Sequence, residues 1–515
     1  MALELSNLTF TEQDDVVPAS GVEEIINSGL ANTLAGNDTI TGTGGTYSIF
    51  NSGTLNTADG NDVIVGVHNS PEENTFYGYG IYNETGTIDT GDGNDIIVGI
   101  IQDSEMGSFL LGHGIYHKGG TIDTGGGNDI ITGITRFGYG IITEWGTLIN
   151  TGDGNDTITG SGEVGLINGS YNDLNNTPSI IDTGKGDDII TGTRYNSNGI
   201  GGLSNGSFGI INTGDGNDII NGDSYYSGIG NGGSMDTGGG DDIITGINDS
   251  GGGYEPAISN TGSIDTSDGN DRITGIGGIG ISNHSTGTIN TGNGEDSIIC
   301  QGKFITYGGV FLDNGNAGLI NSGGVFLGDG NDSLIAEAEV PNRALLKNLN
   351  FIGTGDDNDV ITSTGVIYNE GIIETGNGDD SIIADGDIED NITGNTYSIY
   401  NKGGSINTGN GNDSIIANGG FESDYNSSGS VFLGEGEDYI KGFGSGDFYG
   451  GNGFDTLELT PGSYTVGIWG EGWDTSAIFT KGNQLMITSE FEKLKAGNTI
   501  YDFTSLTAGQ IITVA

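Results

Sequence analysis

Cationic side chains and cysteine are both scarce in this chain. Its 515 residues hold 13 Lys and Arg against 70 Asp and Glu, which gives a formal net charge of −57. Nucleic acids and acidic membrane surfaces are repelled by such a protein, so both are excluded as partners. The chain has one cysteine, Cys300, and this excludes an internal disulfide framework.

Long apolar runs are also missing. No apolar segment approaches the roughly 20 residues that a transmembrane helix needs, so we expect no transmembrane segment. The first residues, "MALELSNLTFTEQDDVVPAS", show no basic region followed by an apolar run, which a cleaved secretory signal peptide would have. If the protein is exported, we therefore expect a route that does not use such a signal.

Glycine, in contrast, is abundant and is arranged in repeats. It supplies 103 of the 515 residues and recurs in turns such as "TGDGNDIIVG" from Thr90 and "TGGGNDIITG" from Thr124. Low hydrophobicity with high net charge is typical of disorder. Strict internal repetition favours instead a solenoid that needs counter-ions to fold.

Each repeat ends its glycine-rich turn on an aspartate, which we call the anchor aspartate. Two residues after it stands Ile or Leu, as in Ile64 and Ile97, and seven residues before it stands another apolar residue, as in Leu55 and Ile88. The anchor aspartates are Asp38, Asp62, Asp95, Asp129, Asp156, Asp188, Asp218, Asp242, Asp271, Asp296, Asp332, Asp359, Asp380, Asp413, Asp438 and Asp455.

A third short apolar element precedes these two in each repeat, as in "GIYN" at Gly80 and "GISN" at Gly280. Three short strands per repeat, each with an inward apolar residue, predict an all-β chain folded as a parallel β-helix or β-roll solenoid. Coils then stack about 4.8 Å apart. The asparagines that end the third element are expected to form a hydrogen-bonded ladder at a corner: Asn51, Asn83, Asn260, Asn283, Asn321, Asn369 and Asn401.

We divide the chain into an N-terminal cap (residues 1–30), the calcium-binding solenoid repeats (31–442), and the last repeats with a C-terminal cap or secretion region (443–515).

The calcium assignment follows from electrostatics. In stacked coils the anchor aspartates form a row with a spacing of about 4.8 Å. Such a row of like charges is unfavourable unless cations lie between neighbouring coils. Glycines allow positive φ and let backbone carbonyls point inward, and carbonyls with carboxylates form an oxygen cage that suits Ca²⁺ better than Zn²⁺ or Mg²⁺.

The turns resemble the glycine-rich calcium-binding repeats of the RTX (repeats-in-toxin, haemolysin-type) family, whose pattern is G-G-x-G-x-D-x-U-x. "GGNGFDTLE" from Gly450 fits the whole pattern, and most other copies fit from the second glycine onward. The resemblance implies several Ca²⁺ ions, about one per pair of stacked turns. The residues it implies as metal site are Asp62, Asp95, Asp129, Asp156, Asp188, Asp218, Asp242, Asp271, Asp296, Asp332, Asp380, Asp413, Asp438 and Asp455, with Gly91, Gly93, Gly125, Gly127, Gly152, Gly154, Gly214, Gly216, Gly450, Gly451 and Gly453.

Three positions are not in this ligand set: Asp38 in the first turn, the third residue of the turns, and Asp359. The third residue of the turn varies, being Asp92 in one copy and Lys185 in another, so we expect it to face solvent. The turn "TGDDND" at Thr354 lacks the second glycine, so its Asp359 is not assigned as a ligand.

The chain departs from the family in one respect. In the family the nonapeptides run consecutively, whereas here most turns come once per coil, which predicts one calcium column on a wider, three-sided β-helix. Only Asp438, Asp447 and Asp455 follow at steps of about nine residues, as in an ordinary β-roll. The segment after Asp455 resembles the uncleaved C-terminal region that directs type I secretion. This implies a protein secreted by, or held on the surface of, a Gram-negative-type bacterium, and a capping role for the same segment is compatible with it.

Three functional classes remain at this point. The leading one is a non-catalytic, secreted, structural or adhesive protein whose partners are calcium and either cell-surface polysaccharide or other copies of itself. A β-helical polysaccharide lyase or epimerase is the first alternative, with His113 and His117 in "GHGIYHKGG" as its best candidate residues. An ice-binding solenoid is the second, but the threonines of "TIDT" do not form the flat Thr-x-Thr face that it needs.

Overall fold

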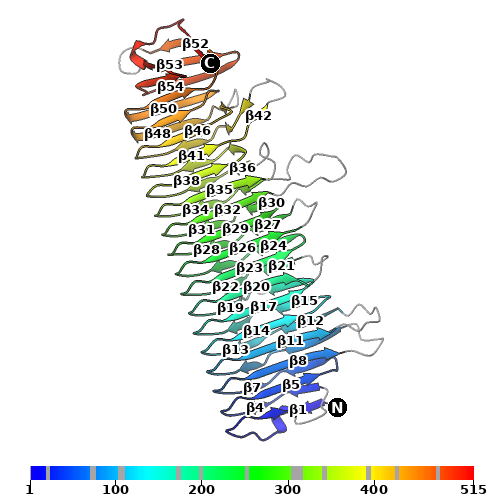
Figure 1. Ribbon diagram of the computed structural model, residues 1–515. Helices are drawn as coiled ribbons and strands as arrows, with labels where there is room; N and C mark the ends of the chain where they lie inside the picture. The colour runs from blue at the N-terminus through cyan, green and yellow to red at the C-terminus, as the bar shows by residue number, and fades with distance from the viewer. Residues whose placement is uncertain are drawn as a thin grey trace. The chain divides into compact units, whose positions relative to one another are not determined.

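The structure is a computed structural model that describes residues 2–18, 24–69, 77–102, 111–169, 176–195, 201–249, 255–302, 317–338, 345–389, 396–423, 428–470 and 476–515. The chain forms two compact units, Met1–Ser250 with Glu255–Asp268, and Gly251–Tyr254 with Gly269–Ala515. Each unit is built from coils of three short strands, one in each of three parallel sheets, here named A, C and B in chain order (Figure 1). The predicted parallel β-helix is confirmed.

In the first unit, each sheet takes one strand from every coil. Sheet A contains β1 (Ala2–Glu4), β3 (Glu24–Asn27), β6 (Tyr47–Asn51), β9 (Tyr77–Asn83), β12 (Leu111–His117), β15 (Tyr139–Thr143), β18 (Val164–Asn168), β21 (Gly201–Asn205), β24 (Ser227–Asn231) and β27 (Pro256–Asn260). Sheet C contains β4 (Leu30–Asn32), β7 (Thr54–Asn56), β10 (Thr87–Asp89), β13 (Gly120–Asp123), β16 (Thr147–Asn150), β19 (Ser179–Asp182), β22 (Gly209–Asn212), β25 (Ser234–Asp236) and β28 (Ser263–Asp265). Sheet B contains β2 (Val16–Val17), β5 (Thr39–Thr43), β8 (Val63–Asn69), β11 (Ile96–Gln102), β14 (Ile130–Ile134), β17 (Thr157–Gly162), β20 (Ile189–Arg194), β23 (Ile219–Ser224) and β26 (Ile243–Asn248).

The second unit repeats this plan. Its sheet A contains β30 (Ile279–Asn283), β33 (Leu319–Asn321), β36 (Leu345–Asn348), β39 (Val366–Asn369), β44 (Ile399–Asn401) and β47 (Phe421–Glu422). Its sheet C contains β31 (Thr288–Asn290), β34 (Gly324–Phe326), β37 (Phe351–Gly353), β40 (Ile372–Glu374), β45 (Ser405–Asn407), β48 (Ser430–Gly436) and β50 (Gly446–Gly453). Its sheet B contains β29 (Arg272–Gly277), β32 (Ser297–Gly302), β35 (Ser333–Ala338), β38 (Val360–Ser363), β41 (Ser381–Ala384), β46 (Ser414–Ala417), β49 (Tyr439–Lys441), β51 (Thr456–Leu459) and β55 (Lys493–Ala496).

The core consists of straight columns of aliphatic side chains, as the repeat spacing predicts. On sheet B, Ile64 is in register with Ile97, and Ile97 with Ile131. On sheet C, Leu55 is in register with Ile88. These side chains are fully buried. Most strands contribute one large aliphatic side chain to these columns and few other apolar groups, so each coil buries little apolar area alone and stability accumulates along the stack.

The asparagine ladder is confirmed and is longer than predicted. In the first unit Asn51 Nδ2 donates to Asn83 Oδ1 at 2.8 Å, and in the second unit Asn369 Nδ2 donates to Asn401 Oδ1 at 2.9 Å. All the ladder asparagines stand at the end of a sheet A strand and are buried. The members that the sequence analysis missed are Asn27, Asn168, Asn205, Asn231 and Asn348.

Replacing one ladder residue should cost stability in proportion to the hydrogen bonds it makes. Asn231 accepts from Asn205 at 2.9 Å and donates to Asn260 at 2.9 Å and to the Ser263 carbonyl at 2.8 Å. We expect Asn231→Leu to lower the free energy of unfolding by about 1–3 kcal/mol, because buried polar groups lose their partners. Thermal denaturation followed by circular dichroism measures this. Asn221→Leu, on the outer face of β23, is the control and should change stability by less than about 0.5 kcal/mol.

The C-terminal end of the second unit is covered by antiparallel strands. β52 (Gly462–Trp469) pairs with β53 (Ser476–Lys481) and β57 (Ile511–Val514), β53 pairs with β54 (Gln484–Ser489), and β54 continues sheet C from β50. β56 (Thr499–Asp502) pairs with β55. Tyr464 and Phe479 are fully buried beneath this layer, so it acts as a cap. Two 3₁₀ turns, Leu5–Asn7 and Phe503–Ser505, and a two-stranded sheet of β42 (Ile388–Glu389) with β43 (Thr396–Tyr397) complete the described elements.

The last coil is narrower than the others, in line with its shorter repeat. The chain passes from β49 to β50 to β51, and only the single bridge between Phe421 and Gly444 continues sheet A there. Asp447, which the nine-residue spacing had placed with Asp438 and Asp455, lies on β50 and accepts a hydrogen bond from Ser428. The sequences "HNSPEENTFYGY" and "IIQDSEMGSFLLGH" are insertions between a sheet B strand and the next sheet A strand, and we expect them to protrude from the solenoid; they fall largely outside the described residues. Among the described residues, no helix is long and apolar enough to cross a membrane.

Candidate metal centre

Each glycine-rich turn connects the sheet C strand of a coil to its sheet B strand. Between β10 and β11, Gly91 has φ 78° and Gly93 has φ 157°, so both adopt the positive φ that the sequence predicts. The same holds for Gly125, Gly127, Gly152, Gly154, Gly214, Gly216, Gly451 and Gly453. Gly450 differs, because its φ is not positive. A Cβ on Gly450 would lie 2.0 Å from the Glu490 carbonyl oxygen, so lack of space requires this glycine.

Four turns keep the same backbone without glycine. Leu34, Ala58 and Ser267 occupy the first glycine position with φ of 68°, 58° and 62°, and Asp357 occupies the second with φ 82°. A non-glycine residue pays a conformational cost there, which the stacking on neighbouring coils has to offset. The loss of a glycine at Asp357 therefore does not remove the turn.

Stacking explains why glycine is otherwise kept at both positions. A Cβ on Gly125 would lie 2.0 Å from the carbonyl oxygen of Gly91, and a Cβ on Gly127 would lie 1.5 Å from that of Gly93. The glycine carbonyls of one turn thus point along the stack at the glycine α-carbons of the next. The turns present two columns of carbonyl oxygens, and a Cβ on Gly60 would lie 3.3 Å from Asp62 Oδ1, so the carboxylates stand beside these columns.

The anchor aspartates form one buried ladder in each unit, here called the anchor column. Within each ladder, Oδ1 of an anchor accepts the backbone N–H of the anchor one coil earlier. In the first unit Asp95 Oδ1 accepts the Asp62 N–H at 2.7 Å, and in the second unit Asp438 Oδ1 accepts the Asp413 N–H at 2.8 Å. All the predicted aspartate ligands are at most 2% exposed. Asp38 and Asp359, which the sequence analysis left out, hold the same place in the ladder.

The second oxygen of each carboxylate, Oδ2, distinguishes this ladder from an ordinary structural one. It is buried and, within the described structure, has no hydrogen-bond partner of normal geometry at Asp38, Asp62, Asp95, Asp129, Asp156, Asp188, Asp218, Asp296, Asp332, Asp359, Asp380, Asp413, Asp438 and Asp455. In most turns the threonine that opens the turn, such as Thr90 beside Asp95, lies near enough to offset part of the rise in the carboxyl pKa that burial causes, but a neutral hydroxyl does not neutralise the carboxylate. A buried carboxylate oxygen without a partner is unfavourable by several kcal/mol in most proteins. Its repetition in successive coils indicates a missing cationic partner.

Burial shifts the titration of these carboxyl groups accordingly. Removal from water raises the anchor pKa from its usual value near 4. The pKa is raised to about 6 at Asp62, Asp156, Asp218 and Asp438, to about 7 at Asp95, Asp188, Asp359, Asp413 and Asp455, and to about 8 at Asp332. Each carboxyl group therefore needs either a proton or a metal ion to be stable where it lies.

The N-terminal end of the first unit's ladder and the C-terminal end of the second unit's ladder differ from the rest of these ladders. At the N-terminal end, Asp15 donates its N–H to Asp38 Oδ1, while its own Oδ2 accepts the N–H of Thr11 at 2.7 Å. At the C-terminal end, Glu492 Oε2 accepts the N–H of Asp455 at 2.8 Å. Neither residue belongs to a glycine-rich repeat, so the repeat pattern does not predict these two caps.

A second ladder runs beside the anchor column in the opposite direction. The residue before each anchor is exposed. In most coils it is Asn or Asp, and its side-chain oxygen accepts the N–H of the equivalent residue one coil later. Asn61 Oδ1 accepts from Asn94 N–H at 2.7 Å, and Asn94 Oδ1 accepts from Asn128 N–H at 2.7 Å. This ladder was not predicted, although most turns contain the dipeptide "ND", in which the asparagine that forms the ladder precedes the anchor aspartate.

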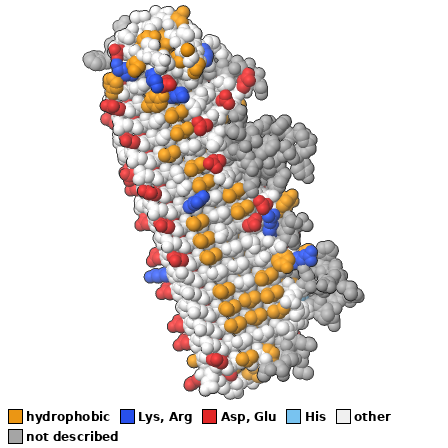
Figure 2. Space-filling view, viewed as in Figure 1, with side chains coloured by type: hydrophobic (Ala, Val, Ile, Leu, Met, Phe, Trp, Pro, Cys, Tyr) orange, Lys and Arg blue, Asp and Glu red, His pale blue; other side chains and the backbone are white. Residues whose placement is uncertain are grey.

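The variable third position of the turn lies in solvent, as predicted. Asp92, Lys185, Asp215 and Asn293 are exposed. Figure 2 shows Asp and Glu side chains gathered along the edge of the molecule where the turns lie. These exposed carboxylates add to the negative potential beside the anchor column without entering it.

The two histidines of the enzyme alternative do not face the same way, although residues four apart on a regular strand would be expected to. His113 lies on the outer face of sheet A, with its ring stacked on Tyr139 at 4.9 Å between centroids. His117 is buried in the asparagine ladder, where Asn83 Nδ2 donates to its Nδ1 and its Nε2 donates to the Leu148 carbonyl, both at 3.1 Å. Gly114, between them, is skipped in the strand pairing, and Gly114 and Ile115 are both buried. The alternation of inward and outward residues along β12 is therefore shifted by one residue at Gly114. Burial lowers the pKa of His117 to about 4.

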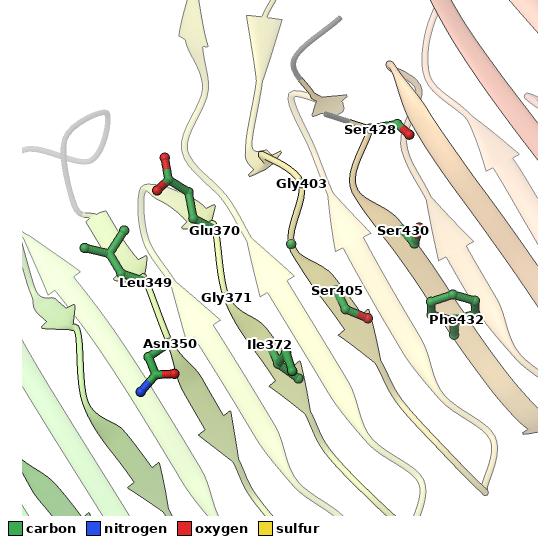
Figure 3. A pocket seen from close by; sticks show the side chains of 11 residues that line it. Leu349, Asn350, Glu370, Gly371, Ile372, Gly403, Ser405, Ser428, Ser430 and Phe432 are labelled. Atoms are coloured by element: carbon green, nitrogen blue, oxygen red, sulfur yellow. The ribbon is translucent and has the colours of Figure 1, made fainter. Parts of the chain in front are cut away.

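A shallow groove of the second unit lies between sheets A and C (Figure 3). Of the described residues that line it, Glu370 alone is ionisable. Its carboxylate accepts hydrogen bonds from Tyr368 Oη and from Lys402 Nζ, and these two partners lower its pKa. A carboxyl group with a lowered pKa stays ionised and is therefore a poor proton donor.

The donor set of the anchor column consists of oxygen atoms. Among the described residues, no three His, Cys, Asp or Glu side chains come together as a side-chain metal cluster. The anchor column does not need one, since each turn brings one carboxylate oxygen and nearby glycine carbonyls, with the same set in the next coil. Hard cations such as Ca²⁺ take six to eight such oxygens, whereas Zn²⁺ prefers nitrogen and sulfur.

No model of a known protein family matches the chain, and no curated protein is significantly similar to it. One solved structure with a similar fold is the X-ray crystal structure of a hyperactive, Ca²⁺-dependent, β-helical antifreeze protein from an Antarctic bacterium. It is 15% identical with a TM-score of 0.29, and the match covers 97% of this chain and 96% of that one. At this identity and TM-score, the likeness carries nothing about what this chain binds or does.

Proposed function

We propose that the anchor column of each unit binds Ca²⁺, about one ion per pair of stacked turns, and that these ions hold the solenoid together. The observation that carries this proposal is the buried, unpartnered Oδ2 of the anchor aspartates in successive coils. An ion beside Oδ2 supplies the missing partner, neutralises the row of carboxylates, and uses the glycine carbonyls as further ligands. Asp38 and Asp359 join the predicted ligands on the same grounds.

Calcium suits this column better than magnesium for a geometric reason. Mg²⁺ requires a near-ideal octahedron and gives up its water slowly, whereas Ca²⁺ accepts irregular cages of carboxylate and carbonyl oxygens. The ligands here are fixed by the coil stacking and cannot rearrange around a smaller ion. The chain's own carboxylates and carbonyls thus select for a larger divalent cation.

Isothermal titration of the full-length chain with Ca²⁺ or Mg²⁺, after removal of metal at pH 8, tests the proposal. We expect several Ca²⁺ ions per chain and much weaker heats with Mg²⁺. Parallel elemental analysis of protein dialysed against calcium gives the stoichiometry independently. A chain that takes up no Ca²⁺ under these conditions contradicts the proposal.

We further propose that the protein works outside the cell as a structural or adhesive element and has no catalytic role. Calcium is plentiful there and scarce in the cytosol, so the ions that stabilise the solenoid are available after export, and the acidic surface keeps the protein soluble. Cell-surface polysaccharide and other copies of the chain are the partners we propose. Export is proposed to depend on the C-terminal region after Asp455. The expected result is full-length protein in the medium of cells that carry a type I exporter, and its absence there in matched cells without one.

A further inference from the structure

The outer face of sheet B in the first unit is an ordered array of side chains without charge. From β5 to β20 each strand presents three outward residues at alternate positions, and none is fully buried. We call this surface the Thr/Val/Ile face. Its rows are Thr39, Thr41 and Thr43; Val63, Val65 and Val67; Ile96, Val98 and Ile100; Ile130, Thr132 and Ile134; Thr157, Thr159 and Ser161; and Ile189, Thr191 and Thr193.

Strict register turns these rows into straight columns. Val65 is paired with Thr41 on one side and with Val98 on the other, and Thr132 is paired with Val98 and Thr159. Rows are therefore about 4.8 Å apart, and side chains within a row about 6.6 Å apart, since alternate residues face outward. Figure 2 shows the hydrophobic members in parallel rows over β8, β11 and β14.

The groups on this face are also rigid. Val, Ile and Thr have two heavy atoms on Cβ, so χ1 is strongly restricted. Partial burial between neighbouring rows restricts these side chains further, and Ile130 and Ile189 are 40% and 36% exposed. Methyl groups and hydroxyls stand at fixed, repeating positions, and water beside such a surface has restricted orientations.

The other two outer faces of this unit have a different chemistry. Sheet C carries carboxylates, with Asp89 bound by Asn56 and Asp123 bound by Asn150. Sheet A carries an aromatic stack in which His113 lies against Tyr79 and Tyr139. The Thr/Val/Ile face is thus neutral and free of aromatic rings in a chain of net charge −57.

We propose that the Thr/Val/Ile face binds ice. The spacing between rows, about 4.8 Å, and the spacing within a row, about 6.6 Å, are similar to the distances between equivalent water molecules in a plane of ice. Fixed methyl and hydroxyl groups at these spacings can hold water in an ice-like arrangement. A second copy of the chain is disfavoured at this face because the face carries no charged group that could offset the repulsion between two acidic molecules. A polysaccharide is disfavoured because the face has neither stacking rings nor a dense set of polar groups. The threonines of "TIDT" take no such part, since Thr90 is buried in its turn.

The test uses the full-length, calcium-loaded protein, and ice itself is the probe. Partition into a slowly growing ice hemisphere and thermal hysteresis are measured for the natural chain, for Thr132→Lys at the centre of the face, and for Thr121→Lys on the outer face of β13. We expect the natural chain and Thr121→Lys to enter the ice and Thr132→Lys to be excluded, with loss of most of the thermal hysteresis. Circular dichroism confirms that both variants are folded.

Three outcomes overturn the proposal. The first is exclusion of the folded natural chain from ice, and the second is identical behaviour of the two variants. The third is a natural chain that sediments as a dimer and becomes monomeric with Thr132→Lys. The last result identifies a self-association surface instead. Because folding and calcium content are measured separately, failure of ice binding is distinguishable from failure of calcium binding.

Discussion

Removal of calcium at pH 8 is expected to unfold the solenoid. Neighbouring anchor carboxylates about 4.8 Å apart repel each other by roughly 3–4 kcal/mol per pair at an effective dielectric constant near 20, and this repulsion recurs at every coil. Far-UV circular dichroism in chelator should show mostly coil. Millimolar Ca²⁺ should restore the β-signal, and the same concentration of Mg²⁺ should not.

The choice of pH follows from the anchor pKa values. Folding raises them from about 4 to about 6–8, so the folded, metal-free chain binds more protons than the unfolded chain between these values. Its stability is therefore highest near pH 4 and falls as the pH rises through about 6–8. Chelated protein should be less folded at pH 8 than at pH 5. A chelated chain that stays fully folded at pH 8 contradicts the calcium assignment.

Asp218→Ala should be among the most damaging single substitutions in the first unit. Asp218 Oδ1 accepts the Asp188 N–H at 2.7 Å, its own N–H donates to Asp242 at 2.8 Å, and its Oδ2 is buried without a partner. We expect a loss of about 3–5 kcal/mol in calcium, comparable to removing one partner of a buried ion pair. One or two Ca²⁺ ions should also be lost, as measured by titration calorimetry and thermal denaturation.

The matched control lies in the same turn. Asp215 is exposed at the variable third position, so Asp215→Ala removes only a surface charge from an acidic edge. It should leave calcium stoichiometry unchanged and stability unchanged or slightly higher. If Asp215→Ala lowers the stoichiometry and Asp218→Ala does not, the ligand assignment is wrong for the whole column.

The core and one ladder were predictable because they follow a fixed offset from the anchor aspartate. Ile97 lies two residues after Asp95 and Ile88 seven before it, and each pair recurs in nearly every repeat. Asn168 and Asn205 were missed because the ladder asparagines have no fixed offset from the previous anchor: Asn168 follows Asp156 by 12 residues and Asn205 follows Asp188 by 17. Only the stacking of the coils brings them beside Asn231 and its neighbours.

The candidate site was predictable in composition but not in detail. Asp359 was set aside because its turn lacks a glycine, yet the neighbouring coils hold Asp357 at φ 82°. Tertiary stacking thus overrides a local preference that sequence reasoning treats as decisive. The caps at Asp15 and Glu492 have no repeat signature, so nothing in the spacing could identify them. The assignment of the anchors as calcium ligands stays a prediction.

The two opposed ladders of the turn make each coil an interchangeable module. Every coil offers its neighbours the same groups, an anchor Oδ1 in one direction and an asparagine-type oxygen in the other. If the segment from Thr213 to Asp236 were excised, Asn212 would be followed by Thr237, and the anchors Asp188 and Asp242 would become neighbours with the same donors and acceptors as before. Length in such a chain can change by whole coils during evolution without redesign of any contact, so the number of coils is a dimension that selection can adjust freely.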